Sequence, residues 1–588
     1  MKILLIYPYC LEERLQADDI NVPPIGIYYV AALLMEHQYD IEVLNWYDIN
    51  RNPQKIKETL AREKADVIGF SILHANRWGA IEISRLAKEV DPDVKIVFGG
   101  VGATFLWEHL LLHFKDIDFI VIGEGEHTFL NIVKCIEEGK YVDIEKIKGI
   151  AFRNEGEIIR TEDAEVVQDL DSLPVPAKYF EYQHVSSTRG CPGSCTFCGS
   201  SQFWGHKVRF HSPGYFVDQL ELLYKKGITF FYFSDDIFTI KKSRVIRICK
   251  EILKRDLKIV WVAISRVNYV NEEILYWMGK AGCIQISYGV ESGSEKIRNR
   301  MLNKNISTDD IKRAFAMTTK FGMLARAYFI YGSPGESWDT IEETIDLIRE
   351  IKPLSIIFYI LDIFPGTALY SDFKRRSGIT DDIWLRQIED IMFFETDPHM
   401  SKELILAFGQ RLRTKYYEML HSFVDAIDLA EDEALCQIHS EFLSRLGMTF
   451  THGDYASIDA IKKKEKIAER LFSKSLDCYP DHRAYLGLGI IKQKERNYKE
   501  SVRILSEGAE CFPDSEPLNI CLGISHMNLG DPNKALLYFL SFQDSSDAVY
   551  YAAKCYEALG DLEKEATFRK KLQSLQQERN YCTRSRGK

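Results

Sequence analysis

The sequence lacks a long apolar run and a concentration of positive charge. Its longest uncharged apolar run, Ile25 to Met35, is far shorter than the roughly 20 residues of a membrane-spanning helix. The formal net charge is −11 over 588 residues, and the one notable basic cluster lies between Arg579 and Lys588. Because a nucleic-acid surface needs a basic footprint, we expect neither nucleic-acid binding nor a membrane span.

We expect neither a secretory leader nor a disulfide framework. The apolar start, Met1 to Tyr7, is too short for a signal sequence and is followed by Pro8. The 13 cysteines are scattered and odd in number, which argues against a secreted disulfide scaffold. We therefore expect a protein of the reducing cytoplasm.

The length predicts about three to four domains. We expect an α/β sheet domain over residues 1–145, a hairpin and linker over 146–186, a barrel domain over 187–375, a helical extension over 376–455 and helical repeats over 456–588. Within the second segment, residues 149–161 are typical of a hairpin with a glycine turn, and the prolines after Asp169 indicate an extended linker.

A loop with three cysteines stands at the centre of the chain. Cys191, Cys195 and Cys198 form a C-x3-C-x2-C triplet among glycines, serines and threonines. Three thiolates can hold three corners of an iron–sulfur cluster, and since a four-iron cube normally takes four cysteines, one iron would stay open. Alternatively, the thiols are free, or they bind zinc with a distant fourth ligand such as Cys249 or Cys283.

Residues 1–145 alternate β-branched runs with helical stretches, which predicts a doubly wound (Rossmann-like or flavodoxin-like) parallel sheet. The expected strands are Lys2–Tyr7, Ile41–Leu44, Val67–Ile72, Lys95–Phe98 and Phe119–Ile122. Ligands of such sheets bind beyond the carboxyl ends of the strands, where glycines let the backbone approach a bulky molecule. The residues found at these ends are Pro24, Gly26, Ser71, His74, Gly99, Gly100, Gly102, Gly123, Glu124 and Gly125.

Six strand–helix units over residues 187–375 predict a partial (β/α)6 barrel of the TIM type. A strand leads into the cysteine loop, and the others are Thr229–Ser234, Ile259–Ser265, Cys283–Val290, Arg326–Tyr331 and Ile356–Ile360. The loops at the carboxyl ends of barrel strands carry the chemistry. The polar residues at those ends include Ser234, Asp235, Ser265, Arg266, Glu291 and Ser292.

These motifs together resemble a known family. The triplet, with Phe197 before its last cysteine, resembles the radical S-adenosylmethionine (SAM) enzymes, and the N-terminal glycine loops resemble the cobalamin-binding domain that precedes some of them. The resemblance implies a 4Fe-4S cluster on the three cysteines, with SAM on the open iron and cobalamin on the N-terminal loops. It assigns SAM binding to Phe197, Ser234, Asp235, Ser265, Arg266, Glu291 and Ser292, and cobalamin binding to the ten strand-end residues given above.

The N-terminal loops lack the D-x-H-x-x-G motif that supplies an imidazole to cobalt in part of that family. His74 could face the corrin or be a polar loop residue without a metal role. Radical methylthiotransferases carry further cysteines in this region, where this chain has only Cys10 and Cys135. The sequence thus argues against that class.

The resemblance implies cleavage of SAM to a 5′-deoxyadenosyl radical, with cobalamin carrying a methyl group to an unactivated carbon. One alternative is a ring-forming or oxidative rearrangement, as in a tetrapyrrole cyclase. Another is an interaction protein that senses its cluster or corrinoid and acts through its repeats. The expected partners are a small-molecule, carrier-borne or peptide-borne substrate and an electron donor such as flavodoxin or ferredoxin.

The C-terminal region has an internal period. Tyr479-Pro480-Asp481 recurs 33 residues later as Phe512-Pro513-Asp514, and Leu488-Gly489 recurs 34 residues later as Leu522-Gly523. This period, with small residues for close helix packing, is typical of tetratricopeptide repeats. Such repeats form all-α arrays that offer a groove to a partner peptide, although they could equally cap the barrel.

Overall fold

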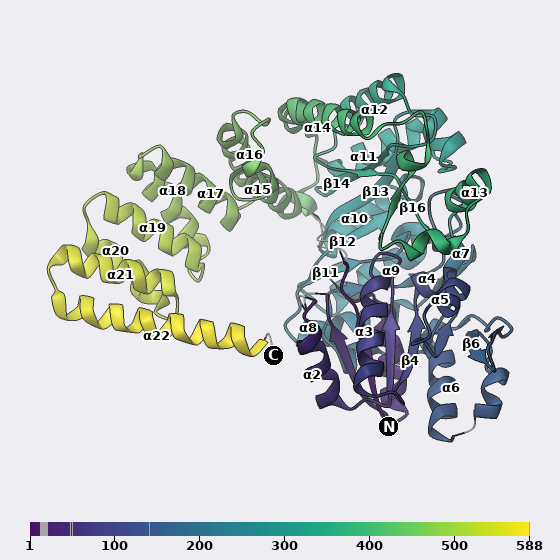
Figure 1. The fold of residues 1–588 in the computed structure, drawn as a ribbon. Coiled ribbons are helices and arrows are strands. Elements are labelled where there is room, and N and C mark those ends of the chain that lie inside the picture. Colours follow the sequence, from purple (N-terminus) through teal and green to yellow (C-terminus); the bar gives the residue numbers. More distant parts are fainter. Residues whose placement is uncertain (12–21, 48, 50, 140, 587–588) are drawn as a thin grey trace. The chain divides into compact units, whose positions relative to one another are not determined.

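The computed structural model describes residues 1–11, 22–47, 49, 51–139 and 141–586 (Figure 1). The chain divides into two compact units. The first comprises Met1–Thr318 and Ala325–Arg413, and the second comprises Thr319–Leu324 and Thr414–Lys588. Both large β-sheets, and every candidate cofactor residue, belong to the first unit.

The N-terminal sheet has seven strands in the order β2-β1-β3-β4-β5-β6-β7. Their bounds are β1 Lys2–Tyr7, β2 Asp40–Asn45, β3 Val67–Ser71, β4 Lys95–Gly99, β5 Phe119–Val121, β6 Ile150–Asn154 and β7 Glu157–Arg160. The first five strands are parallel, in the order 2-1-3-4-5 of flavodoxin-like sheets. The predicted doubly wound sheet is confirmed.

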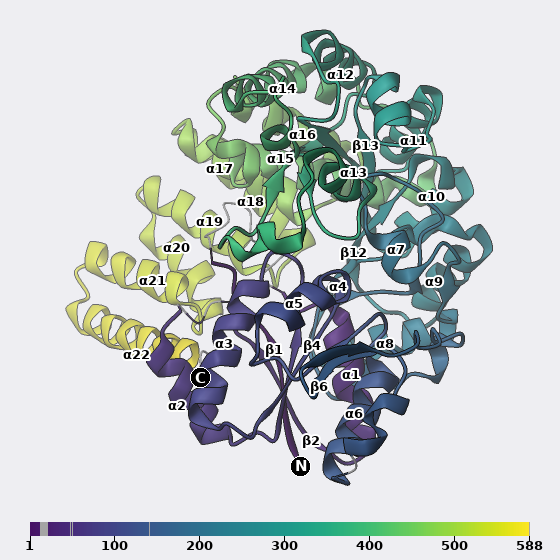
Figure 2. The same ribbon diagram turned by 45° about the vertical axis from the view of Figure 1, so that its right-hand side comes forward.

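The sheet is covered on both faces because side chains alternate along each strand. On one face, Ile3 and Leu5 share a core with α1 (Ile25–Glu36) and α6 (Glu126–Glu137). On the other face, Leu4 and Ile6 share a core with α2 (Pro53–Glu63) and α3 (Arg77–Val90). Figure 2 shows the strands between these two pairs of helices. Two short helices, α4 (Val101–Phe105) and α5 (Trp107–His113), follow β4.

The predicted hairpin over residues 149–161 is β6 and β7, and it extends the sheet. β6 pairs antiparallel with β5, with Phe152 opposite Phe119. The turn places Glu155 at φ +49° and Gly156 at φ +92°, the left-handed conformation of tight hairpin turns. Local sequence patterns do not predict that this hairpin joins the parallel strands, because strand pairing is a long-range contact.

The second sheet has six strands in the order β15-β14-β13-β12-β11-β8. They are β8 His184–Val185, β11 Phe230–Phe233, β12 Val260–Ser265, β13 Cys283–Glu291, β14 Leu324–Tyr331 and β15 Ser355–Ile360. The connecting helices are α8 Pro213–Lys225, α9 Lys242–Lys254, α10 Glu272–Lys280, α11 Thr308–Lys320 and α12 Trp338–Ile351, and α13 Ala368–Ser377 follows β15. In the part of the chain that the structure describes, β15 and β8 stay unpaired edges, so the predicted partial barrel is confirmed.

The second unit is helical. Its helices are α15 Cys436–Thr451, α16 Lys464–Cys478, α17 His482–Lys494, α18 Tyr498–Cys511, α19 Glu516–Asn528, α20 Pro532–Phe539, α21 Ser546–Leu559 and α22 Leu562–Arg586, preceded by the end of α14 (Lys402–Asp425). Small residues allow close packing, since a Cβ on Gly523 would lie 2.5 Å from the Phe539 ring. The predicted helical region is confirmed, whereas its assignment to tetratricopeptide repeats stays a prediction.

No helix among the described residues combines the length and the apolar character that crossing a bilayer requires.

Candidate functional site

The three cysteines lie on one loop, between β9 (Thr188–Arg189) and α7 (Ser200–Trp204). All three are half-buried free thiols. The Gly193 N–H points at the Cys191 sulfur at 3.4 Å, and a Cβ built on Gly193 would lie 3.4 Å from the Cys191 Sγ and 3.8 Å from the Cys195 Sγ. These two sulfurs therefore flank Gly193 closely, as a shared ligand site requires.

The loop is held by backbone contacts to distant segments. Thr196 donates its N–H to the carbonyl of Leu302 at 3.0 Å and its Oγ1–H to that of Met301 at 3.0 Å. Its own carbonyl accepts the N–H of Leu369 at 3.0 Å. Phe197 is half-buried and packs against a core cluster. The loop is thus fixed between α13 and the end of the helical turn Lys296–Met301, which follows β13.

Burial raises the pKa of the Cys198 thiol to about 11, and it raises the pKa of Cys191 as well. Without a cation these thiols are protonated near neutral pH. A metal or cluster would supply the positive charge that makes them thiolates.

The turn after β11 carries Ser234 and Asp235, which were both predicted to bind SAM, and their side chains lie in different surroundings. Asp235 is 1% exposed and accepts hydrogen bonds from the Ser187 N–H and hydroxyl, both at 2.9 Å, and from the Thr188 hydroxyl at 2.6 Å. Its carboxylate therefore fixes the strand that leads to the cysteines. Ser234 lines the cavity described below, and so does Asp236, which the sequence analysis did not select. Asp236 accepts a hydrogen bond from Ser200 at 2.6 Å.

Arg266 and Glu291 lie near the cysteine loop, each with a contact to the same lysine. The Arg266 Nη1 is 4.0 Å from the Cys195 Sγ, and its Nη2 donates to the carbonyl of Lys304. The Lys304 Nζ is 2.6 Å from the Glu291 carboxylate, in an ion pair of which both side chains are nearly buried. Glu291 has φ +67°, a conformation that is uncommon outside glycine. Lys304 was missed because the sequence shows no motif around it.

The two serines predicted to bind SAM near Arg266 and Glu291 form hydrogen bonds within the protein. Ser265 is buried, and its hydroxyl pairs with that of Thr239. Ser292 is also buried, and its hydroxyl accepts the N–H of Ser294 at 3.1 Å. In this arrangement both hydroxyls stabilise turns at the strand ends.

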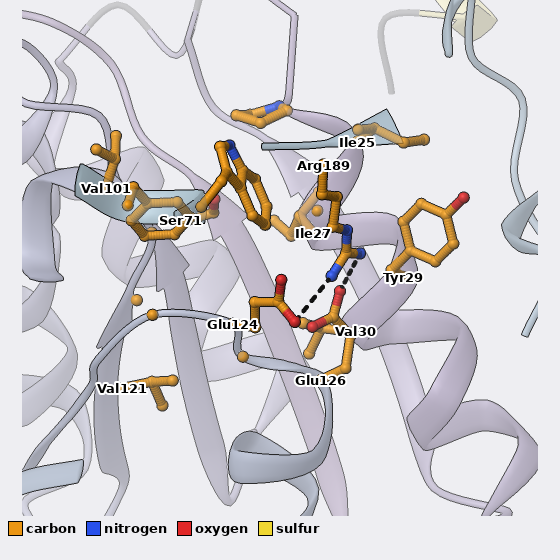
Figure 3. Close-up of a pocket in the computed structure, with 18 of the residues that line it drawn as sticks. Ile25, Ile27, Tyr29, Val30, Ser71, Val101, Val121, Glu124, Glu126 and Arg189 are labelled. Atoms are coloured by element: carbon orange, nitrogen blue, oxygen red, sulfur yellow. Dashed lines mark hydrogen bonds and ion pairs between the residues drawn. The ribbon is translucent and has the colours of Figure 1, made fainter. Parts of the chain in front are cut away.

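A cavity of about 370 Å³ lies at the carboxyl ends of β1, β3, β4 and β5 (Figure 3). Eight of the ten candidate cobalamin residues line it, together with Ser234: Pro24, Gly26, Ser71, Gly99, Gly100, Gly123, Glu124 and Gly125. The opposite wall comes from the segment that carries the cysteines and from the turn after β11: Ser186, Thr188, Arg189, Ser200, Phe203, Trp204, His211, Ser234 and Asp236. Its inner end is apolar and includes Leu5, Gly69, Val97, Val121 and Phe129.

Glycines have different roles in and near this wall. Gly100 has φ +89°, and a Cβ there would lie 2.7 Å from the carbonyl oxygen of Ile72. Cβ atoms on Gly26 and Gly123 would meet no atom within 4 Å, so these two glycines border open space. Gly102 lies outside the lining, and a Cβ there would be 2.6 Å from the carbonyl oxygen of Leu73. Gly102 therefore permits close packing of α4 against the end of β3.

His74 also lies outside the lining. Its ring packs edge-on against Trp384 at 4.2 Å between centroids, and its carbonyl accepts a hydrogen bond from the Arg77 Nη1 at 2.8 Å. The loop thus turns the His74 ring toward the segment after α13, which favours the reading of His74 as a loop residue without a metal role, and its assignment to cobalamin stays a prediction.

A buried ion-pair network forms part of the cavity wall, and the sequence analysis missed it. The Arg189 guanidinium is 2.5 Å from the Glu126 carboxylate and 3.6 Å from that of Glu124 (Figure 3). Arg209 also binds Glu124, with one contact at 3.0 Å. We call these four residues the Arg189 network. All four side chains are at least nine-tenths buried.

Arg189 is also stacked between two aromatic rings, 5.3 Å from the Tyr29 centroid and 5.2 Å from the Trp204 centroid. The network connects the sheet domain with the loop that bears the cysteines, because Arg189 stands two residues before Cys191. The sequence shows an arginine next to the cysteine loop, but it does not indicate which carboxylates pair with that arginine.

Comparisons with known proteins agree with this geometry. Residues 19–133 match the B12 binding domain and residues 185–348 match the radical SAM superfamily. An uncharacterized methyltransferase of Pyrococcus horikoshii is 30% identical over 382 residues, which are 63% of this chain and 82% of that protein. The anaerobic magnesium-protoporphyrin IX monomethyl ester cyclase of Rubrivivax gelatinosus is 29% identical over 399 residues, 65% of this chain and 71% of that protein.

Among solved structures, the radical SAM methyltransferase TsrM of Kitasatospora setae, with cobalamin and a 4Fe-4S cluster bound, superposes with a TM-score of 0.58. The match covers 81% of this chain and 99% of that chain at 15% identity, so it shows a common fold.

Proposed function

The chain belongs to the cobalamin-dependent radical SAM enzymes, and from this membership we propose that it methylates an unactivated carbon of a small-molecule substrate. One observation carries the proposal. The glycine-walled cavity and the three-cysteine loop share a wall, since Ser200 and Trp204, directly after Cys198, line the same cavity as Gly99 and Gly123. Two cofactors held at these places would face each other.

The cysteine loop fits a 4Fe-4S cluster with one open iron. It offers three free thiols on one loop, and burial raises the pKa of two of them, Cys191 and Cys198, so that these two stay protonated until a cation binds. Cys249 and Cys283, the fourth ligands considered for zinc, are buried in α9 and β13 at 0% and 2% exposure. No cysteine is therefore proposed as a fourth ligand, and SAM would take that position.

The cavity has features that suit cobalamin, because it has open space at its glycines and an apolar inner end. Gly26 and Gly123 leave space at the strand ends, where a Cβ would meet nothing within 4 Å. The inner end between the sheet and α6 is walled by Leu5, Val97 and Phe129, which suits an aromatic base of the cofactor. We propose that the eight lining residues hold cobalamin, and that Gly102 and His74 support the fold around it.

When bound, these groups supply a 5′-deoxyadenosyl radical from SAM and a transferable methyl group. The chain's own residues have positioning roles. We propose that Arg266 and Glu291 bind polar parts of SAM, with Lys304 holding the Glu291 carboxylate in place at 2.6 Å. Asp235 orients the cysteine loop through Ser187 and Thr188, and Ser234 and Asp236 face the cavity.

The similarity to a cyclase that acts on a magnesium porphyrin favours a second candidate. A ring-forming oxidation would use the same cluster loop and the same cavity, because both sites lie in the region that this relative shares. The two reactions differ in product. Methyl transfer adds the mass of a CH₂ group to the substrate and yields S-adenosylhomocysteine, whereas cyclisation adds no carbon.

The partners are part of the same proposal. An electron donor such as flavodoxin or ferredoxin would reduce the cluster in a reducing cytoplasm. A carrier-borne or peptide-borne substrate, or a protein partner, could use the C-terminal helices if these are tetratricopeptide repeats.

Anaerobic reconstitution tests the proposal. With iron, sulfide, hydroxocobalamin, dithionite and SAM, the enzyme should release 5′-deoxyadenosine, and it should release S-adenosylhomocysteine as SAM methylates the reduced cobalamin. Cys198→Ala should reduce 5′-deoxyadenosine to background because a cluster ligand is lost. Cys511→Ala is the matched control, since Cys511 is exposed on α18 and should leave the yield unchanged. Equal nucleoside release by both variants would refute the enzyme assignment.

Methyl transfer has its own readout. A methyl-deuterated SAM should label the cobalamin-bound methyl group and then the product. Release of 5′-deoxyadenosine without S-adenosylhomocysteine, under conditions where a substrate is consumed, would favour the cyclase-like reaction.

A further inference from the structure

A second group of metal-ligating side chains lies apart from the cysteine loop. His109 and His113 lie one helical turn apart on α5. Asp382 is the second residue of a short 3-10 helix, Asp381–Leu385, which follows α13. One ligand atom from each of the three residues lies within 4.8 Å of the other two. The His113 Nε2 is 2.9 Å from the Asp382 Oδ1, and the His109 Nδ1 is 3.9 Å from the same oxygen.

The buried histidine of this group has a nitrogen without a hydrogen-bond partner. His109 is 6% exposed, and its Nδ1 makes no hydrogen bond to any described residue. The 3.9 Å separation from Asp382 is too long for one. Because leaving a buried polar atom unsatisfied is costly, this nitrogen indicates a missing ligand between the three side chains.

The donor types suit a metal ion at this point. Two imidazole rings and one carboxylate are a donor set for a divalent metal, and one ligand atom from each lies within 4.8 Å of the others.

The neighbouring charged groups are engaged elsewhere. Asp381 accepts the Tyr370 hydroxyl at 2.6 Å and pairs with Lys374 at 2.8 Å. The Arg77 guanidinium stacks on the Trp384 ring at 4.7 Å and donates to backbone carbonyls, including that of His74 at 2.8 Å. Neither Asp381 nor the Arg77 guanidinium therefore supplies the missing partner of the His109 Nδ1.

We propose that His109, His113 and Asp382 bind a zinc ion, with water as the fourth ligand. Imidazole nitrogens favour zinc over magnesium and calcium, which prefer oxygen donors. In this position the ion would join α5 of the sheet domain to the segment after α13. Since α4 precedes α5 and its first residue, Val101, lines the cavity, the ion would also steady one wall of the candidate cobalamin site.

The experiment uses the full-length protein with its cluster reconstituted, so that the cysteines are occupied. After treatment with a chelator and addition of zinc chloride, metal analysis should find about one zinc ion per chain. Asp382→Asn should weaken zinc binding at least about tenfold, because it removes a ligand charge. Its side chain is 59% exposed, so the substitution should not disturb folding, which circular dichroism can check.

His113→Ala should also lose the zinc, whereas His127→Ala, an exposed histidine on α6, should retain it. X-ray absorption at the zinc edge should show only nitrogen and oxygen ligands at about 2.0–2.2 Å. Zinc should raise the thermal midpoint of the wild type but not that of Asp382→Asn or His113→Ala. Magnesium should leave the midpoint of all three proteins unchanged. A sulfur shell near about 2.3 Å, or equal zinc content in all variants, would overturn the proposal.

Discussion

Replacement of Arg189 by methionine tests whether the Arg189 network joins the cavity to the cysteine loop. The variant leaves the Glu126 carboxylate, 4% exposed, without its cation at 2.5 Å, while Glu124 keeps Arg209. Removing one partner of a buried ion pair costs about 3–5 kcal/mol, because the remaining charge stays buried. Methionine has a similar length and preserves much of the packing between Tyr29 and Trp204. The expected loss is therefore mainly electrostatic.

A double-mutant cycle separates charge from packing. Glu126→Gln in the Arg189→Met background removes the uncompensated charge and should recover at least about 1.5 kcal/mol of the loss. The readout is thermal unfolding, in which the single variant should lower the midpoint of the first unit by about 3–10 °C. Arg349→Met is the control, because Arg349 pairs with Asp346 at the surface, with 58% and 65% exposure, and should change stability by less than about 0.5 kcal/mol. Additive losses in the cycle, or a single-variant loss as small as that of the control, would refute the reasoning.

Three further substitutions address two residues of the candidate site and a buried carboxyl, Glu336, which lies between β14 and α12 and accepts the N–H of Ser333 at 3.2 Å. Gly100→Ala forces a side chain into a φ of +89° and within 2.7 Å of a carbonyl oxygen, which should cost about 1–3 kcal/mol and reduce cobalamin uptake, measured by corrin absorption. Gly156→Ala, at φ +92° with nothing within 4 Å, should bind cobalamin normally, and equal uptake by both variants would contradict the role of Gly100. Burial raises the pKa of Glu336 from 4.5 to about 7, so its stabilising contribution is complete below the unfolded pKa and falls by about 3 kcal/mol as the pH rises to 7. Glu336→Gln should thus be more stable than the wild type above pH 7 and lose this advantage near pH 5 in thermal melts, and a difference independent of pH would contradict the shift. Glu291→Gln should raise the KM for SAM about tenfold or more with unchanged iron content, whereas a parallel loss of iron would indicate a structural role.

Local patterns were sufficient to predict most elements of the first unit. β1 was expected and found at Lys2–Tyr7, since a β-branched run that ends at a proline has few alternatives. β5 was expected to end one residue later than it does. In the second unit, the repeated Pro-Asp motifs mark helix starts. α17 begins after Asp481, whose carboxylate accepts the N–H groups of Arg483 and Ala484 at its N-terminus.

Side-chain partners could not be predicted in the same way, because they depend on contacts between segments far apart in the sequence. Asp235 was assigned to SAM by the family resemblance of its turn, and in the structure three hydrogen bonds turn its carboxylate toward Ser187 and Thr188. His74 follows a strand as well, but Trp384, more than 300 residues later, provides its packing surface. A polar residue after a strand therefore indicates the region of a ligand site. Which of these side chains line the site depends on tertiary contacts.

One segment contributes to both proposed cofactor sites. Between Ser186 and His211 the chain supplies the three cysteines and seven residues of the cavity wall. A radical and a methyl donor must reach the same substrate carbon, and misplacement by about 1 Å can cost two orders of magnitude in rate. Because Thr188 and Arg189 precede Cys191 while Ser200 and Trp204 follow Cys198, a shift of the cluster would move the cavity wall with it. If cluster and cobalamin bind where we propose, sharing one segment would fix the separation of the two sites without a separate interface.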